Sequence, residues 1–374
     1  MSTPDNLSLY VHWPFCLAKC PYCDFNSHVG EAVDHAAWRE ALVGEVERWA
    51  ALTPGRNLTS VFFGGGTPSL MDPQTVANII ARAQSLWTPA PDLEVTLEAN
   101  PGAAEASRFE AFKDAGVNRL SLGVQSLNDE ALRFLGRVHD GAQARAAIVA
   151  TKRIFPRVNL DFIYARPGQS APAWREELRE ALALGVEHYS FYQLSFEPGT
   201  VFGTRHRAGS LAAVDEDTAL ALFTLTQEET ERAGRPAYEI SNHAAPGAEC
   251  RHNRDIWRGG DYVGIGPGAH GRVTLGHISH ALMQHRSPAT WLAAADKTAQ
   301  DEELTPEERW EERILLGLRT REGIGPSDAA GLEQSIVAEL VTEGFAKMHT
   351  NGLRLTPKGV PLLDAILGRL LATG

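Results

Sequence analysis

This 374-residue chain alternates strand-like and helix-like segments, a pattern that few folds accommodate. Short apolar runs rich in β-branched and aromatic residues recur through the first two thirds, and segments with helical spacing separate them. The runs are residues 7–13, 59–65, 93–99, 118–124, 158–164 and 187–194. Alternating β and α units predict a parallel sheet with helices outside it. Six such units are too few for a closed eight-stranded barrel, so we expect an α/β fold built as a partial (β/α)6 TIM-like barrel.

Polar residues and glycines collect at the carboxyl ends of these runs, where α/β barrels place their chemistry. In chain order they are the cysteine-rich stretch 16–23, the turn 64–67, Glu98, Gln125, Asp161 and Gln193. Each has an ordinary structural interpretation on its own, such as a tight turn, a surface carboxylate or a helix cap. Together, on one rim of the barrel, they predict a functional site.

The cysteines are concentrated in one short loop. Three of the four lie in a C-x3-C-x2-C pattern, and these are Cys16, Cys20 and Cys23. Such a loop can wrap an iron–sulfur cube, which takes one cysteine thiolate per iron, and three ligands would leave one iron open to a substrate. A structural zinc ion is the alternative, with His12, His28 or Cys250 as the fourth ligand. Thiols without a metal are the third possibility.

The cysteine pattern after a first strand, followed by GGGTPS, resembles the radical S-adenosylmethionine (SAM) superfamily. The stretches YVHWPFC, FFGGGTPSL, EANP, LSLGVQS, DFIYARPGQS and YEISNHA narrow the resemblance to the family of oxygen-independent coproporphyrinogen III dehydrogenase, and within it to the haem chaperone branch. The resemblance covers essentially the whole chain. It implies a [4Fe–4S] cluster on the three clustered cysteines, with SAM chelated by the open iron.

The resemblance also implies the residues that line the SAM pocket or contact SAM. They are Tyr10, Tyr22, Gly65, Gly66, Thr67, Glu98, Gln125, Arg137 and Asp161. Glycines in the turn allow the backbone to approach a ligand closely. Arg137 lies in a stretch with helical spacing, where an arginine is more often a solvated surface charge. No residue is assigned a catalytic role.

Two departures separate this chain from the dehydrogenase. The dehydrogenase pattern is C-x3-C-x2-C-x-C, and this chain has Phe25 in place of its last cysteine. The dehydrogenase also has an N-terminal extension that helps to enclose the substrate, whereas 15 residues precede Cys16 here. Both departures point to the haem chaperone branch, so we expect no coproporphyrinogen dehydrogenase activity.

A second stretch, residues 250–257, supports the haem interpretation. The haem chaperone branch is similar in having an H-N-x-x-Y-W motif, which reads HNRDIW here, with Ile256 in the tyrosine position. Imidazole and thiolate are both axial ligands of haem iron. The haem candidates are His252, which we favour, Cys250, Asn253 and Trp257. The ordinary alternative is a loop in which the histidine and asparagine satisfy backbone groups and the tryptophan anchors packing.

The sequence changes character from about Leu304. Two helical segments, a short β-rich stretch and a last apolar helix follow, an order that resembles a winged-helix module. We therefore divide the chain into the partial barrel with the cluster at 1–240, a connecting region with the HNRDIW loop at 241–300, and the winged-helix-like module at 301–374. We expect this module to cover the open barrel or to dock a partner.

Charge and composition disfavour several classes of protein. The net charge is −12 and no Lys/Arg stripe is present, which argues against nucleic acid as a partner and against a DNA-binding regulator. The chain has no apolar run of 18 or more residues and no signal peptide, so we expect no integral membrane segment. Sparse, clustered cysteines suit a reducing compartment, so we predict a cytoplasmic protein.

The sequence therefore predicts a SAM- and [4Fe–4S]-binding haem chaperone that carries haem as cargo to haem proteins such as respiratory enzymes. Its expected partners are haem, haem-accepting proteins and an electron donor. The alternative is radical oxidative decarboxylation of coproporphyrinogen III in porphyrin biosynthesis. A metal-stabilised regulator is a third hypothesis and would need zinc in place of the cluster.

Overall fold

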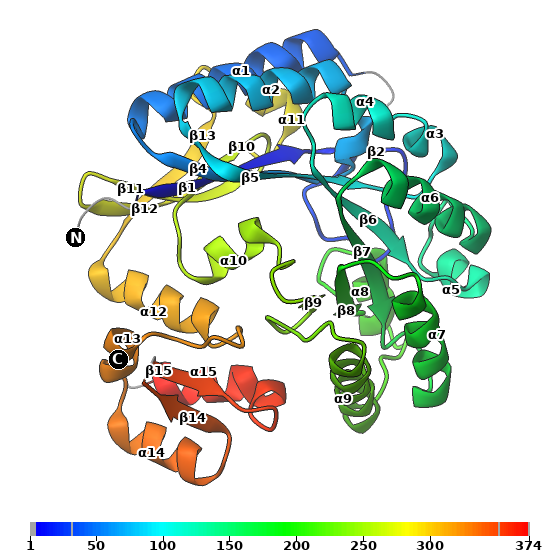
Figure 1. The fold of residues 1–374 in the computed structure, drawn as a ribbon, viewed down its shortest axis with the longest axis vertical. Helices are drawn as coiled ribbons and strands as arrows, with labels where there is room; N and C mark the ends of the chain where they lie inside the picture. Colours follow the sequence, from blue (N-terminus) through cyan, green and yellow to red (C-terminus); the bar gives the residue numbers. More distant parts are fainter. Residues whose placement is uncertain (1–4, 31–32, 351, 373–374) are drawn as a thin grey trace.

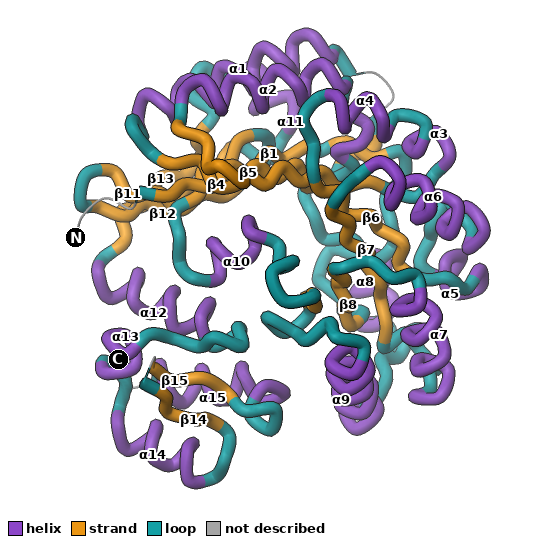
Figure 2. The backbone as a smooth tube through the Cα atoms, viewed as in Figure 1, coloured by secondary structure: helices purple, strands orange, loops and turns teal. Residues whose placement is uncertain are grey.

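Six parallel strands form the wall of a partial barrel, as predicted. The computed structural model describes residues 5–30, 33–350 and 352–372. The six strands are β1 (Asn6–Trp13), β4 (Asn57–Gly65), β5 (Thr88–Ala99), β6 (Arg119–Gln125), β7 (Arg157–Tyr164) and β8 (His188–Gln193), each paired in parallel with the next. The sheet is curved and carries helices on its outer, convex side (Figures 1 and 2).

Helices on the outer side connect these strands. They are α1 (His35–Leu52), α2 (Pro73–Leu86), α3 (Ala103–Ala106), α4 (Phe109–Asp114), α5 (Asp129–Phe134), α6 (Gly141–Ile154) and α7 (Ala171–Ala183), followed after β8 by α8 (Val201–Arg207) and α9 (Glu216–Arg232); a 3-10 turn, η1, spans Pro68–Leu70. Local sequence sets several of their ends. The side chains of Asn128 and Asp140 accept hydrogen bonds from backbone N–H groups of the first turn. Gly116 and Gly185 follow helices with φ of 105° and 68°, the left-handed conformation that glycine favours.

The region 241–300 adds strands to both edges of the sheet. β9 (Asn242–Ala244) pairs antiparallel with β8, and β10 (Tyr262–Ile265) pairs in parallel with β1. An antiparallel meander of β11 (His270–Leu275), β12 (Ile278–Gln284) and β13 (Thr298–Leu304) continues from β10, with α11 (Pro288–Ala293) between its last two strands. The helix α10 (Arg251–Trp257) lies on the concave side of the sheet, opposite α1 and α2 (Figure 1).

The alternation of side chains along β1 shows how the sheet separates core from site. Leu7, Leu9 and Val11 are 0% exposed and belong to the hydrophobic core. The residues that alternate with them are Ser8, Tyr10 and His12. They point to the opposite face because successive side chains of a strand alternate. The concave face of the barrel therefore receives polar and aromatic side chains from a strand whose other face is wholly apolar.

The C-terminal module has a hydrophobic core of its own. It consists of α12 (Pro306–Gly317), α13 (Pro326–Ala330), α14 (Gln334–Thr342), the hairpin β14 (Ala346–His349) and β15 (Gly352–Leu355), the 3-10 turn η2 (Val360–Leu362) and α15 (Leu363–Leu371). An ion pair between Arg258 and Glu322, with 2.6 Å between nitrogen and oxygen, joins it to the region 241–300. Helices followed by a two-stranded hairpin match the predicted winged-helix-like module.

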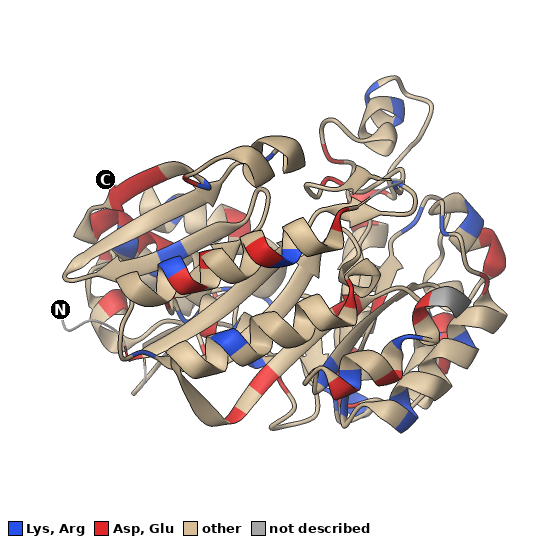
Figure 3. Ribbon diagram, turned by 90° about the horizontal axis from the view of Figure 1, so that it is seen from above, with Lys and Arg blue, Asp and Glu red and all other residues tan. Residues whose placement is uncertain are grey.

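Acidic and basic residues are interspersed along the helices of the face shown in Figure 3. Among the helices of the described residues, none is long and apolar enough to cross a membrane.

Candidate functional site

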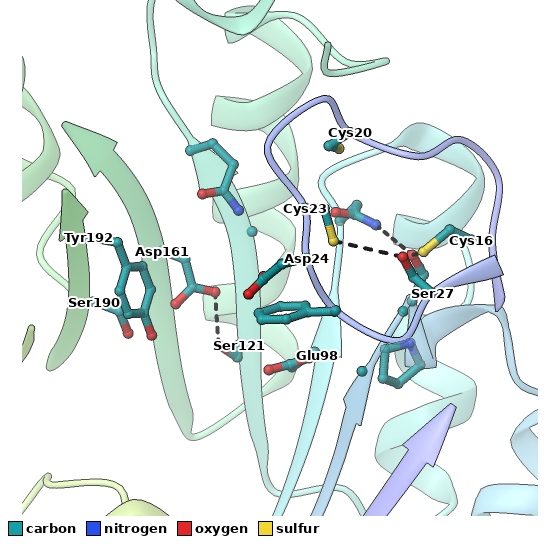
Figure 4. Close-up of a pocket in the computed structure, with 18 of the residues that line it drawn as sticks. Cys16, Cys20, Cys23, Asp24, Ser27, Glu98, Ser121, Asp161, Ser190 and Tyr192 are labelled. Atoms are coloured by element: carbon teal, nitrogen blue, oxygen red, sulfur yellow. Dashed lines mark hydrogen bonds between the residues drawn. The ribbon is translucent and has the colours of Figure 1, made fainter. Parts of the chain in front are cut away.

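A cavity of about 1060 Å³ lies at the carboxyl ends of the barrel strands. Figure 4 shows the cysteine loop on one side of it, with Glu98, Ser121 and Asp161 on the strands beside the loop. The predicted site residues that line the cavity are Tyr10, Cys16, Cys20, Tyr22, Cys23, Gly65, Gly66, Thr67, Glu98, Gln125, Arg137, Asp161, His252, Asn253 and Trp257. Cys250 is the predicted candidate that is missing from this lining.

The cysteine loop runs from β2 (Phe15–Cys16) to β3 (His28–Val29), and its thiols are free. Thr67 donates a hydrogen bond to the sulfur of Cys16 at 3.4 Å, and the sulfur of Cys23 lies 3.8 Å from the hydroxyl of Ser27. Burial raises the pKa of Cys16. Within the described ranges, no group of three or more His, Cys, Asp or Glu side chains is placed to hold a single metal ion. Three thiols on one loop that faces a cavity fit a cube, which takes one thiolate per iron.

The glycine turn after β4 packs directly against the start of this loop. Gly65 has φ of 110°, and a Cβ there would lie 2.6 Å from the imidazole of His12. A Cβ on Gly66 would lie 2.9 Å from the carbonyl oxygen of Phe15, and the Gly66 N–H donates to the carbonyl of Trp13 at 2.7 Å. These glycines are therefore required by contacts within the protein, besides any approach to a ligand.

Asn26 anchors the far end of the cysteine loop, and sequence patterns gave no signal for it. Its side-chain amide donates to the carbonyls of Pro267 and Arg286 at 2.8 and 2.9 Å, on the opposite part of the chain. Its backbone carbonyl accepts from Nε2 of His12 at 3.0 Å, while Nδ1 of the same ring lies 3.0 Å from the hydroxyl of Tyr10. His12, a candidate zinc ligand by sequence, therefore uses both ring nitrogens in hydrogen bonds.

Arg137 is not the solvated helical residue that its sequence context suggests. It follows the end of α5 and turns into the cavity, where Nη1 donates to the sulfur of Cys20 at 3.3 Å and to the hydroxyl of Tyr22 at 3.4 Å. Nη2 donates to Oδ1 of Asn100 and, at 3.2 Å, to the carbonyl of Gly123. Although burial opposes its charge, Tyr22 and Cys20 raise the pKa of Arg137 overall. A cation thus lies directly beside a predicted cluster ligand.

Two half-buried carboxyl groups face the same cavity. Burial, and next the charge of Asp161, raise the pKa of Glu98 to about 8, and a hydrogen bond from the Gly65 backbone opposes this shift. Burial also raises the pKa of Asp161, which accepts hydrogen bonds from Ser121 Oγ at 3.1 Å and from Asn159 Nδ2 at 2.7 Å. At neutral pH Glu98 mostly keeps its proton, so it can donate as well as accept a hydrogen bond.

Gln125 closes β6 in a strained conformation. Its φ of 66° is in the left-handed region, which non-glycine residues rarely adopt. The side-chain nitrogen of Gln125 occupies space that a side chain at position 123 would need, since a Cβ added to Gly123 would lie 2.9 Å from it. Strain of this kind persists where the surrounding structure holds a side chain in place, and it is concentrated at binding sites.

The imidazole of His252, on α10, lies in the wall of the cavity between aromatic rings. Its centroid is 4.9 Å from that of Phe62 and 6.1 Å from that of Tyr10. Its Nδ1 lies 3.0 Å from the hydroxyl oxygen of Ser60. Because the Ser60 hydroxyl donates its own hydrogen to Ser8, it can only accept a hydrogen bond from His252, so Nδ1 carries the proton. Burial lowers the pKa of His252 to about 4. The ring is therefore neutral, with its lone pair on Nε2.

Cys250 is fully buried and holds α10 in place. Its thiol donates to Oε1 of Glu94 at 3.4 Å, and burial raises its pKa to about 12. Glu94 also accepts from the backbone N–H groups of Arg251 and His252, at 3.1 and 3.2 Å, and so caps the helix. Sequence reasoning missed Glu94, which lies inside a strand and has no motif around it.

Comparisons with known proteins show which family the chain belongs to. A family model described as the radical SAM superfamily matches residues 10–182, and one described as the HemN C-terminal domain matches residues 304–362. The chain is 40% identical to the mitochondrial radical S-adenosyl methionine domain-containing protein 1 of Bos taurus, over 98% of this chain and 87% of that protein. It is 36% identical to the haem chaperone HemW of Mycobacterium tuberculosis, over 97% of this chain and 94% of the relative.

A solved structure shares the fold over nearly the whole chain. The structure of coproporphyrinogen III oxidase (HemN) from Escherichia coli, a radical SAM enzyme, superposes with a TM-score of 0.79 at 21% identity. The superposition covers 97% of this chain and 89% of that one. Together with the matches in sequence, it shows that this chain belongs to the radical SAM superfamily, in the family of HemW and HemN.

Proposed function

We propose that this chain is a cytoplasmic haem chaperone that binds SAM and a [4Fe–4S] cluster, holds haem and passes it to haem proteins such as respiratory enzymes. Membership of the radical SAM superfamily implies SAM and the cluster, and the relatives named HemW support haem as cargo. When bound, the reduced cluster would supply the electron that cleaves the sulfonium C–S bond of SAM. An electron donor and haem-accepting proteins are the expected partners.

The residues of this chain would hold the cluster and SAM at one end of the cavity. Cys16, Cys20 and Cys23 supply the thiolates. Thr67 and Arg137 donate to two of the three sulfurs, which stabilises negative charge on them. The protonated carboxyl of Glu98 offers a hydrogen-bond donor to a ligand in the cavity. The remaining predicted SAM residues line the same space.

The state of His252 is the observation that carries the haem part of the proposal. A neutral imidazole whose Nδ1–H is fixed by a hydroxyl presents Nε2 as a ligand for iron, and the partner of the other nitrogen sets the tautomer. The rings of Phe62 and Tyr10 stack near this imidazole and fix its plane. The cavity volume, about 1060 Å³, is at the upper end of the range for small-molecule sites.

Absorbance titration with haemin tests this proposal. We expect His252→Ala to shift the Soret band and weaken haemin binding about tenfold or more, with iron and acid-labile sulfide unchanged. The matched control is His28→Ala, which removes an exposed imidazole beside the cysteine loop and outside the cavity lining. An unchanged spectrum and affinity in His252→Ala would remove this imidazole from the haem site.

The second candidate function is oxygen-independent coproporphyrinogen III dehydrogenation, favoured by the fold shared with HemN. Against it stands Phe25, 59% exposed where the dehydrogenase pattern has a cysteine. The test is an anaerobic assay of the reconstituted protein with SAM, a strong reductant and coproporphyrinogen III. Deoxyadenosine together with protoporphyrinogen would support the dehydrogenase, and deoxyadenosine alone would support a chaperone.

A further inference from the structure

Arg319 is a part-buried arginine in the cavity wall whose guanidinium forms an ion pair but has no hydrogen-bond partner among the described residues. It follows α12 in the C-terminal module, yet its side chain lines the cavity. The nearest carboxylate oxygen is Oε2 of Glu239, 3.5 Å from Nη2. Its Nε is buried, and in the described part of the chain the guanidinium makes no hydrogen bond. A guanidinium has five N–H donors and no acceptor, so unpaired donors beside a cavity favour an anionic ligand.

Neighbouring groups hold this guanidinium in place without consuming its donors. Its central carbon lies 4.8 Å from the ring centroid of Trp257, so the indole covers one face. Glu239 is fixed, because its Oε1 accepts hydrogen bonds at 2.6–2.8 Å from the backbone and side chains of Ser241 and Asn242. The planar fork therefore has a defined position, and its two Nη groups, which unlike Nε are not buried, suit binding of a carboxylate.

The guanidinium and the candidate iron ligand lie along the same wall. Trp257, which Arg319 stacks on, lies five residues after His252 on α10, or about 7.5 Å along the helix axis. Asn253 and Ile256, between them on this helix, also line the cavity. This wall thus offers a metal-binding nitrogen at one end and a fixed cation at the other. Haem matches it, since iron lies at the centre of the macrocycle and the propionates lie at its edge.

We propose that Arg319 binds a propionate carboxylate of the haem cargo, so that the C-terminal module contributes directly to selection of the ligand. This inference rests on the proposed haem-binding function. SAM also carries a carboxylate and occupies the same cavity in the proposed function, so the experiment has to separate the two sources.

The test is a titration of the full-length, cluster-reconstituted protein with haemin and with haemin dimethyl ester, whose propionates carry no charge. We expect the wild type to bind haemin about tenfold more tightly than the ester, and Arg319→Ala to bind both with the affinity of the ester. The matched control is Arg321→Ala, two residues away, which pairs with Glu231 at 3.1 Å and lies outside the cavity lining. The control should keep the preference for haemin.

A second variant separates binding from packing. Arg319→Ala leaves the fully buried Glu239 without its cation, which can destabilise the fold. The double variant Arg319→Ala/Glu239→Gln removes both charges, and we expect it to lack the preference for haemin as well. An equal loss for haemin and the ester in both variants would show a packing role and overturn the inference.

Two further outcomes are decisive. A wild type that binds haemin and the ester equally would refute the role of Arg319 while the chaperone function stands, whereas a wild type that binds neither would refute both. SAM binding, measured by equilibrium dialysis, should be unchanged in Arg319→Ala. Loss of SAM binding with an intact preference for haemin would assign Arg319 to the carboxylate of SAM and overturn the inference.

Discussion

Replacing Arg137 with glutamine removes a guanidinium that donates to the sulfur of Cys20, 3.3 Å from Nη1. Hydrogen bonds that involve a charged group contribute about 1.5–3 kcal/mol. A positive guanidinium stabilises the more negative, reduced state of a cluster bound to Cys20. Loss of this hydrogen bond should therefore lower the one-electron reduction potential by about 60–130 mV. Burial strengthens the effect, because a cation inside the protein is screened less than one in water.

Spectroelectrochemical titration of the reconstituted protein measures this shift. Arg133→Gln is the matched control, because Arg133 is an exposed residue in the last turn of α5, four positions before Arg137. Arg137→Lys keeps the charge without the planar fork, so its potential should lie between those of the wild type and Arg137→Gln. If the glutamine variant held a full complement of iron and had the same potential as the Arg133→Gln control, Arg137 would have no influence on the cluster.

Three other predictions concern the turn, the carboxyl of Glu98 and the thiols. Gly65→Ala should lower the free energy of unfolding, measured in urea, by about 2 kcal/mol more than Gly55→Ala. Both glycines have positive φ, but only a Cβ at position 65 would meet a neighbour within 4 Å. Equal effects of the two substitutions would show that the contact with His12 does not exclude a side chain at position 65. Since the pKa of Glu98 is raised to about 8, the folded state keeps a proton that the unfolded state has already released. Stability should therefore fall as pH rises from about 4.5 to 8. Glu98→Gln should reduce this dependence on pH, measured as the midpoint of urea unfolding at each pH. Cys20→Ser should lower bound iron and visible absorbance, whereas Cys250→Ser should keep both, and unchanged iron in the former would contradict the cluster assignment.

Repeating patterns in the sequence were enough to predict the barrel. The six parallel strands follow from apolar runs separated by helical segments, since each pattern has its own period. The strand order then brings their carboxyl ends to one rim, which is why Glu98, Gln125 and Asp161 could be placed together from sequence. The strands after residue 241 were not expected from the sequence. One of them, β13, is mostly polar and exposed and so lacks an apolar face to reveal it.

Contacts between distant segments could not be predicted in this way. Arg137 and Cys20 are 117 positions apart, and Asn26 reaches a carbonyl 241 positions away. Nothing in the local sequence distinguishes Arg137 from a solvated helical arginine, because its burial depends on where the end of α5 meets the cysteine loop. Arg319 is a similar case, since only the docking of the C-terminal module brings it to the cavity.

The fold class, the family and the chemical types gathered at the rim follow from the amino-acid sequence, because periodicity and spaced motifs are local properties of a chain. The protonation states of those groups depend on how the chain packs in three dimensions. The proton on Glu98, the neutral ring of His252 and the inert thiol of Cys250 depend on burial and on partners from other elements. Desolvation is a property of the packed molecule, so no reading of the linear chain supplies it.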